Sequence, residues 1–313
     1  MKHCCVVGGT GFIGVKVVHA LRISGRKVTV VGRSTQPSRL LPEDVAYFAG
    51  DIADNRFMAA RLQNADEIID LAYSSVPKTS FENPVGDILS NLPASVGMFE
   101  LACTFQIKKM IFVSSGGTIY GEPLALPILE THPTDPISPY GITKLALEKY
   151  AFMFHRLKNL PITCVRPSNP FGEGQKPYIG QGFVATAIAS VLSDTEITLF
   201  GHTGTVRDYI YIDDLARGIV AALDSGLPGE CYNIGSGIGR NNTEIVASIS
   251  RIAIEYGMEP RVHRQPERPF DVSANILDCS KLHKISGWEP HIDFEEAIHR
   301  TFTWYLAHVH DYQ

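Results

Sequence analysis

The first half of the chain alternates between short apolar runs and longer segments with helical periodicity. Short apolar runs bounded by Gly, Pro or polar residues are typical of buried strands, and apolar positions three or four apart are typical of helices. The runs that predict strands are Cys4–Val7, Lys27–Val31, Val45–Ala49, Glu67–Ala72, Lys109–Ser114 and Pro161–Arg166. Two long helices are predicted over Pro84–Phe105 and Tyr140–Arg156. This alternation predicts a doubly wound parallel sheet with helices on both faces.

The regular alternation of strand and helix patterns ends at Arg166. Residues 167–182 are rich in Gly, Pro and polar side chains, and they predict an irregular loop. Further predicted elements are the helices Phe183–Leu192, Asp213–Leu223 and Thr243–Tyr256, the strands Ile197–Phe200, Asp208–Ile212 and Cys231–Ile234, and two short terminal helices. We therefore expect a dinucleotide-binding Rossmann domain over residues 1–167 and a smaller α+β substrate domain over residues 168–313. Part of the second segment is expected to return to the first domain.

A glycine-rich turn joins the first strand to the first helix. Gly8, Gly11 and Gly14 are each three residues apart, and Phe12 and Ile13 begin the apolar face of the helix. Backbone amides at a helix start point at a bound anion, and glycines let the pyrophosphate and the helix approach the strand. The turn therefore predicts a dinucleotide site.

Composition narrows the class of protein. A hydrophobic share of 44% and a charged share of 19% describe an ordinary globular chain, and the net charge of −5 argues against nucleic-acid or membrane partners. No leader or membrane span is predicted. The six scattered cysteines form no C-x-x-C pair, so we expect reduced thiols, a cytoplasmic location and no metal site.

Four further motifs follow the glycine-rich turn in order: Ser114–Gly121, Pro139–Lys144, Arg207–Ala216 and Tyr232–Gly237. Together the five motifs resemble the extended short-chain dehydrogenase/reductases, in particular the nucleotide-sugar epimerase/dehydratase branch typified by UDP-galactose 4-epimerase. The resemblance implies a nicotinamide cofactor, a nucleotide-sugar substrate and a homodimer built on the two long helices.

Tyr140 and Lys144 are four residues apart on a predicted helix, so they share one face. A Lys ammonium beside a phenol stabilises the phenolate and lowers the Tyr pKa from about 10. This predicts that Tyr140 is a general base near neutral pH. By resemblance, Tyr140 removes the proton of the sugar 4-hydroxyl, and Lys144 also holds the nicotinamide ribose.

The third catalytic group departs from the family pattern. The resemblance implies a serine at position 116, where this chain has Gly116. Ser115 and Thr118 are the available hydroxyls, and Thr118 is slightly preferred because the glycines can redirect the loop. The related 4,6-dehydratases carry an Asp-Glu pair where this chain has Gly117 and Thr118, so dehydration is not expected.

The resemblance also assigns cofactor contacts, with NAD as the expected cofactor and NADP as the alternative. NAD-binding members usually carry an acidic residue after the second strand, but this chain has Gly32 and Arg33, and Arg33 suits adenine or a 2′-phosphate. The other implied contacts lie at the glycine-rich turn, at the adenine and beneath the pyrophosphate: Gly8, Gly11, Phe12, Ile13, Gly14, Asp51, Ile52, Leu71, Ala72, Tyr73, Tyr140 and Lys144.

The substrate half matches a nucleotide-diphosphate pattern. By resemblance, Asn169 contacts the substrate phosphate and Phe200 lies against the base. Arg207 and Arg268 bind the diphosphate, for which planar guanidinium groups are suited, and Asp271 contacts the ribose.

The leading functional prediction is C4 epimerisation of a UDP-sugar through a 4-keto intermediate, with transient hydride transfer to a retained cofactor. The alternative is an NADPH-dependent 4-ketoreductase of a nucleotide 4-keto-6-deoxy sugar, which Arg33 and Gly116 favour. A third possibility is a catalytically silent dinucleotide-binding protein, and the intact Tyr140 and Lys144 argue against it.

Overall fold

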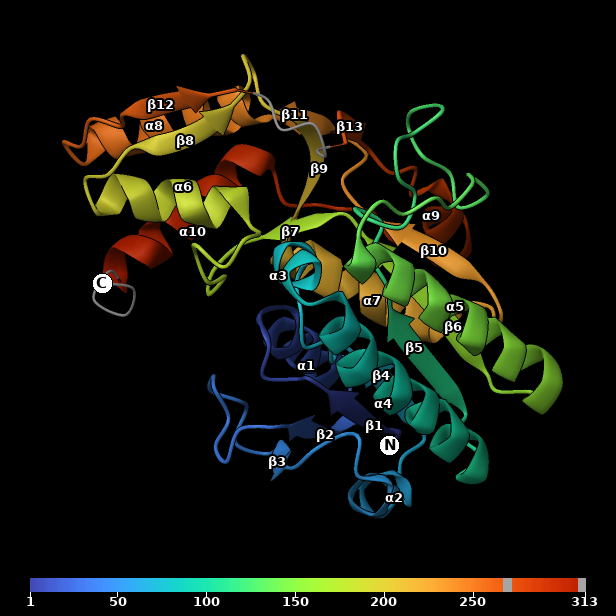
Figure 1. Ribbon diagram of the computed structural model, residues 1–313. Helices are drawn as coiled ribbons and strands as arrows, with labels where there is room; N and C mark the ends of the chain where they lie inside the picture. Colours follow the sequence, from blue (N-terminus) through green and yellow to red (C-terminus); the bar gives the residue numbers. More distant parts are fainter. Residues whose placement is uncertain (267–271, 309–313) are drawn as a thin grey trace.

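The computed structural model describes residues 1–266 and 272–308, and its largest unit is a parallel seven-stranded sheet (Figure 1). The strand order is β10-β6-β5-β4-β1-β2-β3, with every neighbouring pair parallel. The strands are β1 (His3–Val7), β2 (Lys27–Gly32), β3 (Ala46–Ala49), β4 (Glu67–Asp70), β5 (Lys109–Val113), β6 (Ile162–Pro167) and β10 (Cys231–Ile234). The order reverses between β1 and β4, where sheets of this kind bind ligands. The predicted doubly wound sheet is confirmed.

Each face of the sheet has its own apolar core, because alternate strand residues point to opposite sides. Cys4 and Val6 pack with α1 and α7, whereas Cys5 and Val7 pack with α2, α4 and α5. These helices are α1 (Phe12–Ile23), α2 (Asn55–Leu62), α4 (Pro84–Thr104), α5 (Pro139–Lys158) and α7 (Ile212–Ser225). In Figure 1, α4 and α5 lie side by side in front of the sheet.

The second lobe, at the upper left of Figure 1, is built on two smaller sheets. One contains β7 (Asn169–Phe171), β9 (Val206–Tyr211), β11 (Gly239–Asn241) and β13 (Ala274–Asn275), and the other pairs β8 (Ile197–Phe200) with β12 (Val262–Gln265). The remaining helices are α3 (Pro77–Glu82), α6 (Phe183–Leu192), α8 (Asn242–Glu255), α9 (Ser280–Ser286) and α10 (Phe294–Ala307). The chain returns from this lobe to the large sheet at β10, which pairs with β6.

Several local predictions are corrected. α8 begins at Asn242, one residue before the predicted start, because Asn241 caps it and exchanges side-chain and backbone hydrogen bonds with Glu244 in a capping box. α10 extends over 14 residues and is not short. β7 lies inside the segment predicted to be irregular, since its pairing partner β9 is distant in sequence. α4 continues through Pro93, as predicted.

All six cysteines are free thiols. Within residues 1–266 and 272–308, no helix has the length and apolar character needed to cross a membrane. The same residues contain no cluster of three or more His, Cys, Asp or Glu side chains arranged to hold a metal ion.

Candidate active site

The glycine-rich turn leaves β1 at the strand-order reversal and has the shape of an anion cradle. Gly8 has a φ of +78°, which favours glycine, and a Cβ added at Gly14 would lie 2.3 Å from the Gly8 carbonyl oxygen. Helix α1 begins after Gly11 without a side-chain cap, so the first-turn amides are not used by a capping side chain. A pyrophosphate group fits such a helix start.

The other predicted cofactor residues line the ends of neighbouring strands. A Cβ added at Gly8 would lie 3.1 Å from the Ala72 amide nitrogen, which brings the loop after β4 against the turn. The Gly50 amide donates to the Gly32 carbonyl at 2.9 Å, so Arg33 and Asp51 emerge from adjacent strand ends. Both side chains are exposed, and Ile52 is half-buried beside them.

The second strand cannot carry an acidic residue at position 32 without rearrangement. A Cβ added at Gly32 would lie 2.8 Å from the Tyr47 hydroxyl oxygen. That hydroxyl is fixed by its hydrogen bond to the Ser34 carbonyl at 2.6 Å. A side chain at position 32 would therefore have to displace the Tyr47 hydroxyl.

Tyr140 and Lys144 lie in the first two turns of α5, at the end of β5. Ser138 caps the helix by accepting the Gly141 amide at 3.1 Å. The Ser115 side chain lies near enough to the Tyr140 phenol to lower its pKa. The buried Lys144 ammonium donates to the Val113 carbonyl at 2.8 Å. The structure thus brings three of the four predicted catalytic side chains to one strand end.

The electrostatics of this pair differ from the sequence-based prediction. Burial raises the pKa of Tyr140 to about 12, the Ser115 hydroxyl opposes this shift, and Asp87 adds to it. Burial also lowers the pKa of Lys144 to about 8, against the attraction of Asp70, Glu148 and Asp87. Lys144 is not among the groups that shift the pKa of Tyr140 in this arrangement, so its lowering of that pKa stays a prediction. The ammonium is directed at the Val113 carbonyl and lies 5.9 Å from the Tyr140 ring centroid.

Gly116 occupies a position that leaves no room for a side chain. An added Cβ would lie 2.6 Å from Leu277 Cδ1, 2.9 Å from the Arg166 carbonyl oxygen and 3.0 Å from the Pro167 carbonyl oxygen. The Thr118 hydroxyl is buried and has no hydrogen-bond partner within the part of the chain that the structure describes. Since the Ser115 hydroxyl acts on the pKa of Tyr140, this arrangement favours Ser115 over the slightly preferred Thr118 as the substitute hydroxyl.

We predict that Gly116→Ser, which introduces the serine of the family pattern, destabilises the protein by about 1–3 kcal/mol through overpacking. Gly117→Ser is the matched control, because a Cβ there would meet only the Asn169 amide at 3.8–3.9 Å. Thermal and urea unfolding of both variants measure the difference. Equal stability of Gly116→Ser and the wild type would contradict the steric argument.

The loop after β5 that carries Ser115, Gly116, Gly117 and Thr118 (the catalytic loop) also contacts the second lobe. The Asn169 side chain faces Gly117 and donates weakly to the Asp208 carbonyl at 3.4 Å. Arg207 is in register with Asn275, whose amide donates to the Gly116 carbonyl at 3.0 Å. Both predicted substrate residues therefore lie on strands that adjoin the catalytic loop.

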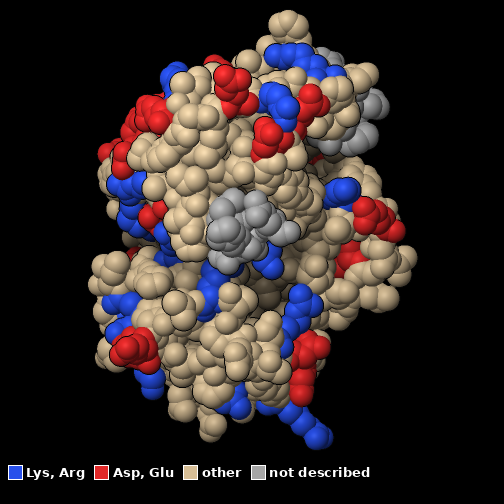
Figure 2. All heavy atoms as spheres, turned by 90° about the vertical axis from the view of Figure 1, so that its left-hand side faces the viewer, with Lys and Arg blue, Asp and Glu red and all other residues tan. Residues whose placement is uncertain are grey.

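The remaining predicted substrate residues are less closely tied to this loop. Phe200 is half-buried at the end of β8, in the separate two-stranded sheet. Arg268 and Asp271 fall outside the described residues. Figure 2 shows a hollow between the two lobes with Lys and Arg side chains at its margin, which suits a negatively charged ligand.

A buried carboxylate that the sequence analysis did not identify lies beside the catalytic pair. Asp87, in the first turn of α4, accepts hydrogen bonds from the hydroxyls of Thr143 (2.6 Å), Ser75 and Tyr73. Asn91, one turn later, donates to the Asp87 carbonyl at 2.7 Å. The four-residue spacing of these polar side chains on a predicted apolar helix was the available signal.

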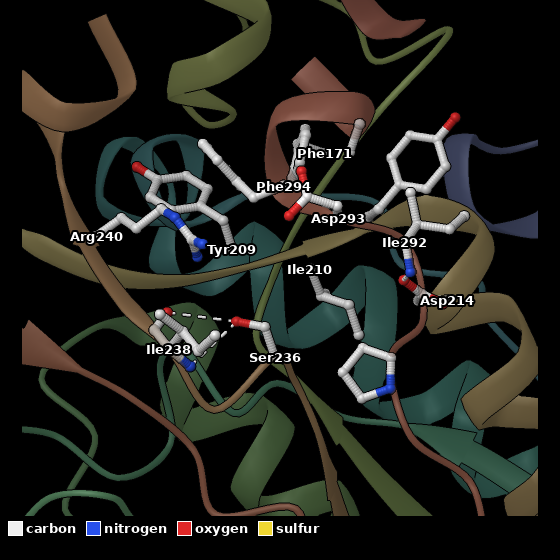
Figure 3. A pocket seen from close by; sticks show the side chains of 13 residues that line it. Phe171, Tyr209, Ile210, Asp214, Ser236, Ile238, Arg240, Ile292, Asp293 and Phe294 are labelled. Carbon is white, nitrogen blue, oxygen red and sulfur yellow. Dashed lines mark hydrogen bonds between the residues drawn. The ribbon is translucent and has the colours of Figure 1, made fainter. Parts of the chain in front are cut away.

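A separate pocket lies between β9, α7 and α10 (Figure 3). Its lining is largely aromatic and aliphatic and includes Phe171, Tyr209, Ile210 and Phe294. Its carboxylates already serve the fold: Asp214 accepts two backbone amides, and Asp293 caps α10. None of the predicted site residues is among those that line it.

Comparison with known proteins agrees with this geometry. Residues 4–235 match the model of the NAD dependent epimerase/dehydratase family. The chain is 31% identical over 301 residues to a putative UDP-glucose 4-epimerase of Methanocaldococcus jannaschii, covering 96% of this chain and 97% of that protein.

Two solved structures are similar along nearly their full length. The Thermus thermophilus UDP-glucose 4-epimerase in complex with NAD has a TM-score of 0.90 and 32% identity, with 97% of this chain and 99% of that one covered. The Thermotoga maritima UDP-glucose 4-epimerase with UDP-glucose has a TM-score of 0.91 and 32% identity, with 98% and 100% covered. The cradle, the Tyr140 and Lys144 arrangement and these similarities together show that the chain belongs to the NAD dependent epimerase/dehydratase family.

Proposed function

We propose that the chain is a nucleotide-sugar 4-epimerase that acts on a UDP-linked sugar with tightly bound NAD. The observation that carries this proposal is the grouping of Tyr140, Ser115 and the buried Lys144 at the end of β5, with only β4 between this strand and β1, which leads into the glycine-rich turn. The similar proteins named UDP-glucose 4-epimerase support the choice of reaction and base.

In the proposed reaction, Tyr140 takes the proton of the sugar 4-hydroxyl and later returns it. Ser115 orients the phenol, and Lys144 places a positive charge near it. Bound NAD supplies the acceptor and donor of the hydride that leaves and returns to C4, so the hydroxyl is inverted without net oxidation. Gly117 and Thr118 provide no carboxylate, and this disfavours the elimination of water that a dehydratase performs.

We assign NAD to the large-sheet side of the hollow between the two lobes (Figure 2) and the nucleotide sugar to the side of the second lobe. The amides of Phe12 and Ile13 hold the pyrophosphate, and Lys144 holds the nicotinamide ribose. Gly8, Gly11 and Gly14 shape the turn, in which the Gly11 amide donates to the Gly8 carbonyl. The remaining proposed contacts are Arg33, Asp51, Ile52, Leu71 and Ala72 for the cofactor, and Asn169, Phe200, Arg207, Arg268 and Asp271 for the nucleotide sugar. We further propose residues 1–167 as the cofactor domain and 168–313 as the substrate domain, with α7 and β10 returning to the large sheet.

The proposal is tested by denaturing the purified protein and identifying the released small molecules by mass spectrometry. An epimerase recycles its cofactor, so NAD near one molecule per chain is the expected result. The competing function is a 4-ketoreductase with NADPH, which the pair Gly32 and Arg33 favours. Released NADP, or a chain without nucleotide, would support that alternative and make Arg33 the next residue to substitute.

We also propose that two copies associate through an exposed apolar face on α4 and α5. The face consists of Val85, Ile88, Leu89, Ile142, Tyr150, Met153 and Leu157, all of them exposed. Contiguous apolar patches of this kind are uncommon on monomers and mark interaction sites.

The free cysteines are consistent with a reducing, cytoplasmic location.

We predict that Leu89→Arg combined with Met153→Arg yields a monomer, because two charges would be buried at the helix contact. Ile254→Arg on α8 is the control, since Ile254 is similarly exposed but outside this face. Analytical ultracentrifugation measures the mass. A wild-type monomer, or a dimer that persists in the double variant, would contradict the proposed interface.

A further inference from the structure

We infer that Tyr73, oriented by Asp87, is a positioning residue for the catalytic pair: its ring holds the Lys144 ammonium and the Tyr140 side chain in their working arrangement. By resemblance, Tyr73 belongs to the loop beneath the pyrophosphate. The inference rests on the proposed function, because it takes Tyr140 and Lys144 as the reacting pair.

The first support is the position of the Tyr73 ring. The Lys144 ammonium lies 4.1 Å from its centroid, closer than to the ring of Phe112 (5.1 Å) or of Tyr140 (5.9 Å). The Tyr73 and Tyr140 rings are in edge contact, with centroids 4.8 Å apart and an interplanar angle of 72°. One side chain therefore contacts both members of the catalytic pair.

The second support is the anchoring of the Tyr73 hydroxyl. It lies 3.3 Å from each carboxylate oxygen of Asp87, a side chain buried in α4. Asp87 also accepts from Ser75 in the same loop and from Thr143, the neighbour of Lys144 in α5. A buried carboxylate needs such donors. Asp87 therefore links the Tyr73 loop to the helix that carries the catalytic pair.

The third support is the chemistry of an aromatic ring as a partner for a cation. A ring face attracts an ammonium without neutralising it, and it leaves the N–H donors of Lys144 available for other acceptors. Burial raises the pKa of the Tyr73 phenol, so its hydroxyl stays protonated and donates to Asp87. The ring thus fixes the direction of the ammonium while keeping its charge.

The first experiment observes Lys144 directly, without substrate or turnover. The protein is labelled with lysine carrying ¹³C at the ε-carbon, and the Lys144 signal is identified by its loss in Lys144→Arg. Protons over an aromatic face are shifted upfield, so we expect an upfield Lys144 signal in the wild type but not in Tyr73→Leu. An intermediate shift is expected in Tyr73→Phe and in Asp87→Asn, since each alters the hydrogen bond that orients the ring and keeps the ring itself.

The same signal reports the charge of Lys144 as the pH is raised. Its pKa is about 8 in the wild type, and Tyr73→Leu is expected to lower it, since the ring favours the ammonium form. The charged or titratable groups that face Lys144 from the neighbouring elements are unchanged by this substitution: Asp70 on β4, Asp87 on α4, Glu148 on α5 and Cys164 on β6.

The second experiment measures kinetics on the same variants. We expect Tyr73→Leu to lower kcat about tenfold with little change in KM, and to move the alkaline loss of activity to lower pH. Tyr73→Phe, which keeps the ring but loses its hydrogen bond to Asp87, should lower kcat less than Tyr73→Leu does. Tyr256→Leu is the matched control, because Tyr256 is a half-exposed tyrosine that stacks on Phe302 in the second lobe.

Two outcomes would overturn the inference. One is a Lys144 signal and titration in Tyr73→Leu that equal those of the wild type. The other is an unchanged kcat and pH profile in that variant. If Tyr73→Leu does not fold, Tyr73→Phe and Asp87→Asn carry the same comparison. Because the spectroscopic test needs no turnover, absence of epimerisation would count against the proposed function while leaving the Tyr73 result interpretable.

Discussion

Tyr140→Phe is expected to lower epimerase activity by about 10³-fold, because it removes the group that takes and returns the proton of the sugar 4-hydroxyl. The variant should keep the fold, since the substitution removes a single hydroxyl and the ring retains its edge contact with Tyr73. Substrate and product are followed by ion-exchange chromatography, and folding is followed by thermal denaturation.

Tyr150→Phe is the matched control for this substitution. It lies on the same helix but is exposed on the α4 and α5 face, away from the Lys144 side. Its activity should equal that of the wild type. Full activity of Tyr140→Phe would remove the basis of the proposed function and would favour a different base or a silent protein.

The largest effect on stability is expected from Glu148→Ala. Glu148 is 1% exposed and pairs with Arg166 through two hydrogen bonds of 3.0 and 2.6 Å. Arg166 also donates to the Tyr120 hydroxyl at 2.9 Å. Removing the carboxylate leaves a buried guanidinium without its counter-ion, which costs about 3–5 kcal/mol. Urea unfolding at constant ionic strength measures the change in the free energy of unfolding.

The control for this prediction is Glu296→Ala, which breaks the pair between Glu296 and Arg300 on the surface of α10. Its free energy of unfolding should stay within error of the wild type, because solvent screens exposed pairs. Similar losses in the free energy of unfolding of the two variants would contradict the argument that burial makes loss of the Glu148 carboxylate more costly than loss of an exposed one.

The parts of the fold that follow from local pattern were predictable from the sequence. Three elements, Phe183–Leu192, Ile197–Phe200 and Cys231–Ile234, have the predicted bounds, because apolar runs and turn residues define their ends. The strand Asn169–Phe171 was not predictable in this way. It is three residues long and exists because β9 offers a pairing edge.

The same distinction, between features set by local pattern and features set by contacts between elements, holds for the candidate site. Tyr140, Lys144 and the glycine-rich turn are set by spacing within one element, so the sequence could identify them. The direction of the Lys144 ammonium and the role of Asp87 depend on contacts between α4, α5 and the loop after β4, which spacing does not encode. The choice between Ser115 and Thr118 likewise depended on how Ser115 lies relative to Tyr140, which the spacing does not give.

The central claim is tested most directly by incubating the purified protein with UDP-glucose deuterated at C4 and no added cofactor, and following the sugar signals by NMR. The account predicts conversion to UDP-galactose with the deuterium retained at C4, since the hydride returns to the carbon that released it. It also predicts no net formation of reduced cofactor. No interconversion of the two sugars by protein shown to contain NAD, or loss of the C4 deuterium to solvent, would contradict the account.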